Sequence, residues 1–326
     1  EFRRVLFRSI NMERRHFLKT AVLGAVAGTV GLKGMKLFAS EKTAPGTIPG
    51  KDDIPDLVAI MGGEPEQLYA RAIQEMGGMS RYIKPGMKVV VKPNIVWDKS
   101  SEYAACTNPV LVGAIVRDCL AAGASQVKVF DHTCDHWRGC YENSGIQEAV
   151  KQAGGEMVNA HEERYFLDTE LPQALRMKTA KIHEALLECD AWINVPVLKN
   201  HGGARMTLCM KNYMGIVWDR RYMHSNDLQQ CIADAATFEK RPVLNIVDGY
   251  RIMTQNGPKG RSLEDVQTPK ALFMSQDIVA VDTAATQFFN QFRDMTLEDA
   301  SHLLLAEKHQ LGTTKLDALN IKRIRL

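Results

Sequence analysis

The chain alternates short apolar runs with longer amphipathic stretches from about Asp53 onward. The apolar runs have the length of buried strands, and the amphipathic stretches have helical spacing. The pattern predicts strands over residues 56–62, 87–92, 126–130, 156–160, 191–197, 243–247 and 271–274. It predicts helices over residues 65–76, 109–122, 144–153, 181–188, 227–238, 278–292 and 297–309. Apolar strands separated by helices are typical of a parallel sheet covered on both faces. We therefore expect an α/β fold with a mostly parallel β-sheet and helices on both faces.

This alternation becomes irregular at residues 161–180, where we expect either a boundary between two lobes or an insertion. The α/β domain is expected to cover residues 56–292, with a linker at 40–55 before it and a C-terminal helix and tail at 293–326 after it. A domain of this length can bury a full hydrophobic core.

An export signal is predicted ahead of the domain. Arg14 and Arg15 precede Phe17 and Lys19, and an apolar run rich in Gly and Ala follows at 21–32. This order is typical of a twin-arginine signal peptide, whose export machinery carries folded proteins, so we expect a periplasmic or other extracytoplasmic location. A retained anchor is the alternative. The run is shorter than the roughly 20 apolar residues that span a bilayer, so no stable membrane span is expected.

The segment at residues 1–39 also explains the basic character of the chain. Residues before Met12 match no part of an export signal and are interpreted as sequence upstream of the true start, and cleavage is expected after Ala39. Residues 1–39 carry eight Lys and Arg against two acidic residues, and the whole chain has a net charge of +3, which leaves −3 for the remainder. Without a basic surplus, nucleic-acid binding is not expected.

Polar side chains follow several of the predicted strands. These residues are Lys92, Asn94, Asp131, His132, Lys199, His201 and Asp248, and two later motifs add Lys211, Asn212 and Asp282. In an open parallel sheet, ligands bind beyond the carboxyl ends of the strands, so we expect a shared site there. Lysines suit a small anion such as phosphate or carboxylate, and Asp and His side chains suit a divalent ion that bridges to it. The alternative is a set of solvated salt bridges, each contributing roughly 0–1 kcal/mol.

Roles within this site follow from side-chain chemistry. The three lysines, with Asn94 and Asn212, are expected to bind the anion. Asp248 and Asp282 are expected to hold the metal, and His201 is expected to act as a general acid or base.

A second candidate site lies in the motif DHTCDHWRGC at residues 131–140. Asp131, Cys134, His136 and Cys140 are potential ligands of zinc or iron. Cys134 and Cys140 could instead form a disulfide or remain free thiols. The chain has seven cysteines and no CxxC pair, so an iron–sulfur cluster of the ferredoxin type is not expected. Walker, dinucleotide-binding, GxSxG and HExxH motifs are also absent from the sequence.

Several motifs together resemble one known family. They are KPN at 92, TNP at 107, LAAGASQVKVFD at 120, NVPVLKNHGG at 194, MKNYMGIV at 210, LNIVDGYR at 244 and DIVAVDTAA at 277. In this order they resemble the domain of unknown function 362 family over about residues 56–292, and CYENSGIQEAVKQAGG at 140 resembles its exported branch. The resemblance implies no settled activity. Some family members carry a ferredoxin-like cluster module, which this chain lacks.

The sequence therefore favours an exported α/β protein that binds a small anionic ligand together with a divalent metal at the carboxyl ends of the strands. Its expected partners are the twin-arginine export machinery and that ligand. The alternative is a redox or metal-carrier protein that uses Cys134, His136 and Cys140, and a third interpretation is a binding module that presents its ligand to a partner.

Overall fold

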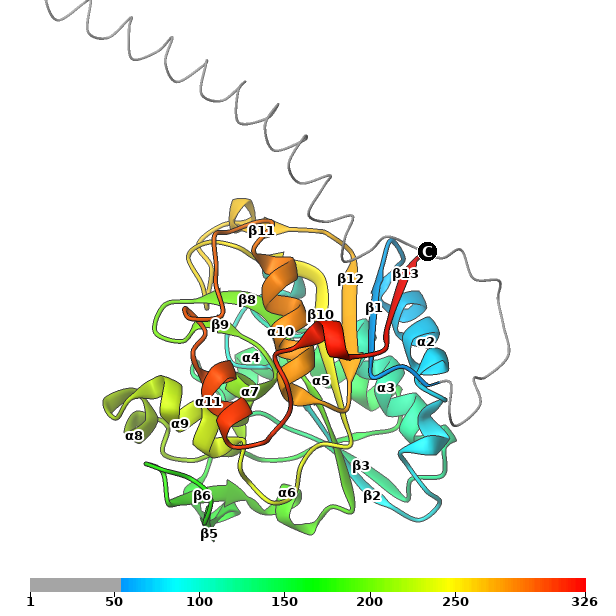
Figure 1. Ribbon diagram of the computed structural model, residues 1–326. Helices are drawn as coiled ribbons and strands as arrows, with labels where there is room; N and C mark the ends of the chain where they lie inside the picture. The colour runs from blue at the N-terminus through cyan, green and yellow to red at the C-terminus, as the bar shows by residue number, and fades with distance from the viewer. Residues whose placement is uncertain (1–53) are drawn as a thin grey trace, which may run out of the picture. The chain divides into compact units, whose positions relative to one another are not determined.

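A mixed sheet of eleven strands forms the centre of the structure, a computed structural model that describes residues 54–326 (Figure 1). Its main path runs β13 (Ile321–Arg325), β1 (Leu57–Met61), β12 (Ala271–Ser275), β10 (Leu244–Met253), β7 (Ala191–Val195), β2 (Lys88–Pro93), β3 (Gln126–Val129) and β4 (Glu156–Met157). Off this path, β8 (Val197–His201) and β11 (Val266–Gln267) pair with β10, and β9 (Arg205–Thr207) pairs with β8. The described residues belong to one compact unit, Ser40–Leu326.

Most strands of the main path are parallel. β4, β3, β2, β7 and β10 run in one direction, and β13 is parallel to β1. β12 is the reversed strand between them, antiparallel to both β10 and β1. The expected α/β fold with a mostly parallel sheet is confirmed.

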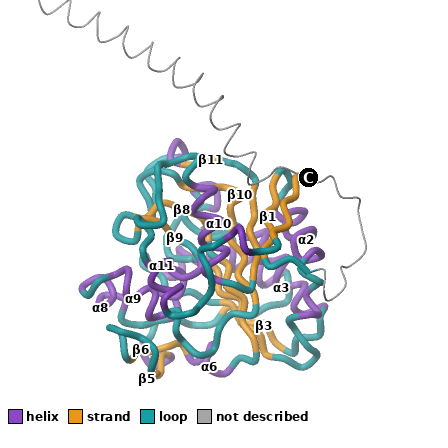
Figure 2. Tube along the Cα trace, in the orientation of Figure 1, coloured by secondary structure: helices purple, strands orange, loops and turns teal. Residues whose placement is uncertain are grey.

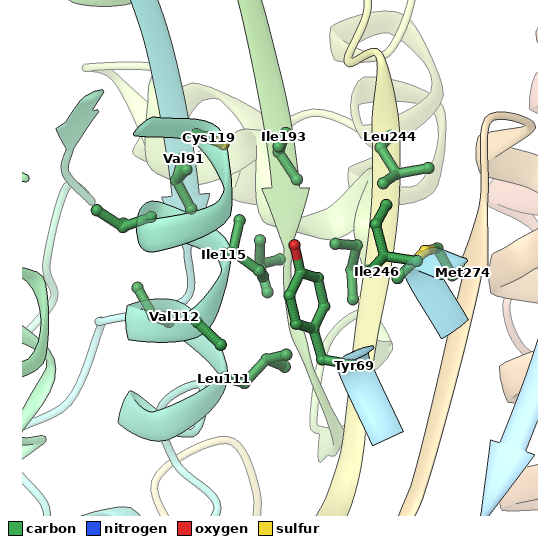
Figure 3. Close-up of a cluster of buried hydrophobic side chains, with 14 of the residues drawn as sticks. Tyr69, Val91, Leu111, Val112, Ile115, Cys119, Ile193, Leu244, Ile246 and Met274 are labelled. Carbon is green, nitrogen blue, oxygen red and sulfur yellow. The ribbon is translucent and has the colours of Figure 1, made fainter. Parts of the chain in front are cut away.

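Helices cover both faces of this sheet (Figure 2). Leu272 and Met274 of β12 belong to a buried cluster that includes residues of α2 (Pro65–Glu75) and α3 (Pro109–Ala121), shown in Figure 3. The residue between them, Phe273, points to the opposite face because successive side chains of a strand alternate. There it packs against Phe288 of α10 (Ile278–Phe289), with the ring centroids 5.3 Å apart.

The remaining helices are short. They are α4 (Trp137–Asn143), α5 (Ile146–Gln152), α6 (Glu184–Glu188), α7 (Cys209–Asn212), α8 (Arg220–Ser225), α9 (Leu228–Ala235) and α11 (His302–Lys308). Within residues 54–326, no helix has the length and apolarity of a membrane-spanning segment.

Three of the segments in which the structure differs from the sequence prediction have a clear physical reason. The helix expected at 181–188 begins only at Glu184, because His183 ends a strand and its side chain accepts the backbone N–H of Ala185 at 3.1 Å. The irregular stretch near 161–180 contains β5 (Phe166–Glu170), which pairs with β6 (Thr179–His183) as a separate two-stranded sheet. The expected C-terminal tail contributes β13, drawn in red beside β1 in Figure 1.

Candidate functional site

A fully buried lysine near the carboxyl end of β2 organises the site. Val91 of β2 packs in the apolar cluster with α3, so its neighbour Lys92 points to the other face, where it is 0% exposed. Its Nζ lies 2.7 Å from Oδ1 of Asp131, just past β3, and donates to Oδ1 of Asn212 in α7 at 2.9 Å. Burial lowers the pKa of Lys92, and the charge of Asp131 acts in the opposite direction. Lys92, Asp131 and Asn212, all predicted for the site, are therefore in direct contact.

Lys92 is part of a polar row that crosses four strands. In register it pairs with Asn194 of β7, which pairs with Asn245 of β10, which pairs with Ser275 of β12. All four residues are fully buried. Asn194 receives a hydrogen bond from Asn212 at 2.9 Å and donates to Asn245 at 3.3 Å. Asn194 and Asn245 were missed by sequence reasoning, and their signal was a polar residue inside an otherwise apolar strand.

The network continues to Lys199, which lies in β8. Its Nζ donates to Oδ1 of Asn94 at 2.8 Å and to the carbonyl oxygen of Ala105. Asn94 in turn donates to Oδ1 of Asn212 at 3.2 Å. Burial lowers the pKa of Lys199 to about 8. The two lysines Lys92 and Lys199 are thus bonded into one buried network through the amides of Asn94 and Asn212.

A cavity of about 380 Å³ lies over this network. Four cationic residues line it: Lys199, Lys211, Arg220 and Arg221. None of its lining residues is an Asp or a Glu. Among residues 54–326, the side-chain amine of Lys211 has neither a hydrogen-bond nor an ion-pair partner, and burial together with the charge of Lys199 lowers its pKa to about 7. The cavity is therefore a cationic pocket without a counter-ion from the described chain.

Two histidines line the same cavity. Nδ1 of His201 accepts the backbone N–H of Ala204 at 3.1 Å, so Nε2 carries the proton of the neutral ring. Burial and the nearby lysines Lys211 and Lys199 lower the pKa of His201 to about 2. The ring of His224 stacks on it with the centroids 6.4 Å apart, and burial lowers the pKa of His224 as well. His201 is therefore a neutral hydrogen-bond donor at neutral pH.

Arg220 lines the cavity and is held by several hydrogen bonds. Its guanidinium donates to the carbonyl oxygens of His132 at 2.7 Å and Thr133 at 2.6 Å, and to Sγ of Cys134 at 3.3 Å. Cys134 lines the cavity and is exposed, whereas the other six cysteines are buried.

His132, also predicted for the site, lies elsewhere. Its Nδ1 is 3.0 Å from the carbonyl oxygen of Val217, and its ring stacks on Trp218. His132 does not line the cavity.

The two carboxylates expected to hold a metal instead anchor backbone. Asp248 accepts the N–H groups of Asn108 at 2.7 Å and Tyr250 at 3.0 Å, which positions the start of α3. Asp282 of α10 accepts the N–H groups of Cys209 and Met210, both at 2.9 Å, which fixes the first turn of α7. Burial raises the pKa of Asp248 to about 6 and that of Asp282 to about 7.

The other metal candidates do not assemble either. Asp131 is paired with Lys92, Cys140 is fully buried in α4, and His136 is exposed at the start of that helix. All seven cysteines, each within the described part of the chain, are free thiols. No three Asp, Glu, His or Cys residues in that part come together as metal ligands. The candidate ligands named from the sequence therefore do not form a metal site within residues 54–326.

The sequence of the chain matches one known protein family. The family described as "Domain of unknown function (DUF362)" matches residues 89–287, which is more than half of the chain. The chain belongs to the DUF362 family. The resemblance of the sequence to this family is thereby confirmed, and its placement in the exported branch stays a prediction. The DUF362 match begins in β2 and ends in α10, so it contains Lys92, Lys199, Lys211 and the rest of the polar network.

One curated protein and one solved structure are similar to this DUF362 chain, which spans about half the length of the solved one. The "Thylakoid-associated protein sll1697" of Synechocystis is 25% identical over 248 residues, which cover 74% of this chain and 73% of that protein. The lactate racemase apoprotein of Thermoanaerobacterium thermosaccharolyticum is 12% identical with a TM-score of 0.42, and the similarity covers 68% of this chain and 55% of that one.

Proposed function

We propose that this DUF362 chain binds a small anion, a carboxylate or a phosphate, in the cavity above Lys92 and Lys199. The observation that carries the proposal is Lys211, an amine with no partner among residues 54–326 in a cavity lined by three further cationic residues and no acid. Like charges in a poorly solvated cavity repel one another, and a bound anion relieves that repulsion.

The side chains of the cavity divide into charged and neutral groups. Lys199, Lys211 and Arg220 supply positive charge. The buried amide of Asn94 holds Lys199, and the backbone carbonyl oxygens of two residues hold Arg220. His201 offers its Nε2–H as a neutral donor. Since the described residues bring together no set of three metal ligands, the proposal assigns no divalent metal to the chain's own side chains.

Cys134 provides a direct test because it is the exposed cysteine and lines the cavity. We expect phosphate or acetate to slow alkylation of Cys134 by iodoacetamide in a saturable manner at constant ionic strength, with peptide mass spectrometry as the readout. Lys211→Met should remove this protection, and the exposed Lys308→Met should retain it. Alkylation that is unaffected by both anions, or equally protected in Lys211→Met, would contradict the proposal.

We further propose that the chain is exported through the twin-arginine route. The support is the order of Arg14, Arg15, Phe17 and the apolar run after them, which lies outside the described residues. Replacing both arginines by lysine should leave the protein in the cytoplasm when cells are fractionated. An unchanged extracytoplasmic fraction would reject this route.

A further inference from the structure

We infer that Lys211 is a nucleophilic amine that forms an imine with a small 2-oxo carboxylate bound in the cavity. The inference rests on the proposed anion binding and narrows its ligand class. A carboxylate satisfies the cationic lining, and a carbonyl next to it offers the electrophilic carbon that an unprotonated lysine attacks. The cavity, at about 380 Å³, is in the size range of small-molecule sites.

The bonding of the three lysines distinguishes Lys211 from the other two. Lys92 is paired with Asp131 and donates to Asn212, and Lys199 donates to Asn94 and Ala105. Lys92, which also donates to the carbonyl oxygen of Pro93, therefore uses three protons in fixed bonds, and Lys199 uses two. Lys211 makes no such bond with any residue from 54 to 326, so its nitrogen lone pair remains available to a ligand once a proton is lost.

The backbone that carries Lys211 is held firmly. Asp282 fixes the first turn of α7 through the N–H groups of Cys209 and Met210, and Asn212, the next residue after Lys211, is tied to Lys92 and Asn194. The amine therefore starts from an anchored position. Anchoring of this kind favours a reaction because less freedom is lost when the reacting atoms meet.

The electrostatic surroundings favour the unprotonated amine. Burial and the positive charges of Lys199, Arg220 and Lys92 lower the pKa of Lys211 to about 7, although the nearby Cys134 acts in the opposite direction. An exposed lysine has a pKa near 10.4 and is almost entirely protonated at neutral pH. The described chain thus contains a lysine that is a substantially better nucleophile than a surface lysine.

The reaction balances without an oxidant or a reductant. The lone pair of Lys211 Nζ forms a bond to the carbonyl carbon, the π electrons of the C=O bond move to oxygen, and that oxygen takes a proton. The nitrogen, which carries a positive charge after the attack, loses a proton to solvent and regains its lone pair. The hydroxyl of the carbinolamine takes a proton and leaves as water while the lone pair forms the C=N bond, and the protonated imine returns one proton to solvent. Lys199 is a suitable proton donor to the departing oxygen, because two of its three protons are in fixed bonds, the third is not, and its pKa is lowered to about 8.

Reductive trapping tests the inference. The full chain is incubated at pH 7 with 2-oxobutyrate and sodium cyanoborohydride, digested, and mapped by mass spectrometry. We expect a saturable adduct on the peptide that carries Lys211, at least tenfold more abundant than the adduct on exposed Lys308. The reduced analogue 2-hydroxybutyrate should give no adduct but should protect Cys134 from alkylation.

The controls separate this inference from the proposed function. Lys211→Arg keeps the positive charge, so it should retain protection of Cys134 and lose the adduct. Adducts spread evenly over surface lysines, or retained in Lys211→Arg, would overturn the imine. Protection of Cys134 by 2-hydroxybutyrate without any adduct from 2-oxobutyrate would reject the imine and leave anion binding standing. Failure of both compounds to protect Cys134 would reject the anion site itself.

Discussion

Gly215 lies directly against the ion pair of Lys92 and Asp131. A Cβ at this position would overlap Oδ1 of Asp131 and Nζ of Lys92, both of which are fully buried. The residue therefore leaves room for the pair that anchors β2 to the loop after β3.

Replacing Gly215 with Ala should destabilise the protein by about 3 kcal/mol, because the added methyl group displaces a buried ion pair. The measurement is urea denaturation followed by circular dichroism. Gly202→Ala is the matched control, since a Cβ there meets no atom within 4 Å. Equal stability of the two variants would show that the pair tolerates displacement.

Asp131→Asn should cost roughly 3–5 kcal/mol of unfolding free energy, because it leaves the charge of Lys92 buried without a counter-ion. The double variant Lys92→Met/Asp131→Asn should cost less than the sum of the two single changes, since it removes both charges. Chemical denaturation of the four proteins gives the coupling energy. Additive effects would mean that the 2.7 Å pair contributes no coupling.

Lys211→Met should stabilise the ligand-free protein, by about 1–3 kcal/mol near pH 6 and by less near pH 10. The pKa of Lys211 is lowered in the folded state, from 10.5 to about 7, so its contribution to stability is present above pH 10.5 and is lost as the pH falls through 7. The methionine side chain does not titrate, so this pH-dependent contribution is absent from the variant. The exposed Lys308→Met should change stability by no more than about 0.5 kcal/mol at either pH. A loss of stability in Lys211→Met at pH 6 would show that the amine is paired.

Asp282→Asn should change how stability depends on pH. The pKa of Asp282 is raised from 3.8 to about 7 in the folded state, so its favourable contribution is present below pH 3.8 and is lost as the pH rises through 7. The stability of the wild-type protein minus that of the variant should therefore fall between pH 4 and pH 8, on the order of 3 kcal/mol. Denaturation at a series of pH values measures this difference. A constant difference would mean that Asp282 does not titrate in that range.

The sequence was sufficient to predict the meeting of Lys92, Asn94, Asp131 and Lys199. These residues follow apolar strands, and the carboxyl ends of parallel strands share one edge of a sheet. It was also sufficient to predict most strands of the main path, because each is an apolar run between clear turn signals.

The roles of Asp248 and Asp282 could not be predicted in the same way. A carboxylate that follows a strand or sits in a helix is compatible with a metal ligand and with an acceptor of backbone N–H groups. The two roles can be told apart only from the folded structure, which brings the backbone N–H of Asn108 to Asp248 and that of Cys209 to Asp282. The polar row through Asn194 and Asn245 likewise depends on strand register, which no local pattern specifies.

The C-terminal strand was missed for a different reason. Residues 321–325 read IKRIR, and the three basic residues gave the segment the composition of a solvated tail. Charged residues are common on edge strands because they discourage pairing with other chains. β13 is such an edge, paired with β1 and with no further neighbour in the described sheet.

The pairing of β1 has a consequence for synthesis of the protein. Both of its neighbours, β12 and β13, come from the last part of the sequence, so LVAIM at 57–61 leaves the ribosome long before either neighbour exists. An apolar strand with two unpaired edges is prone to aggregate until its neighbouring strands have been synthesised. We therefore expect the nascent chain to depend on a chaperone that shields this first strand until translation of the C-terminal residues is complete.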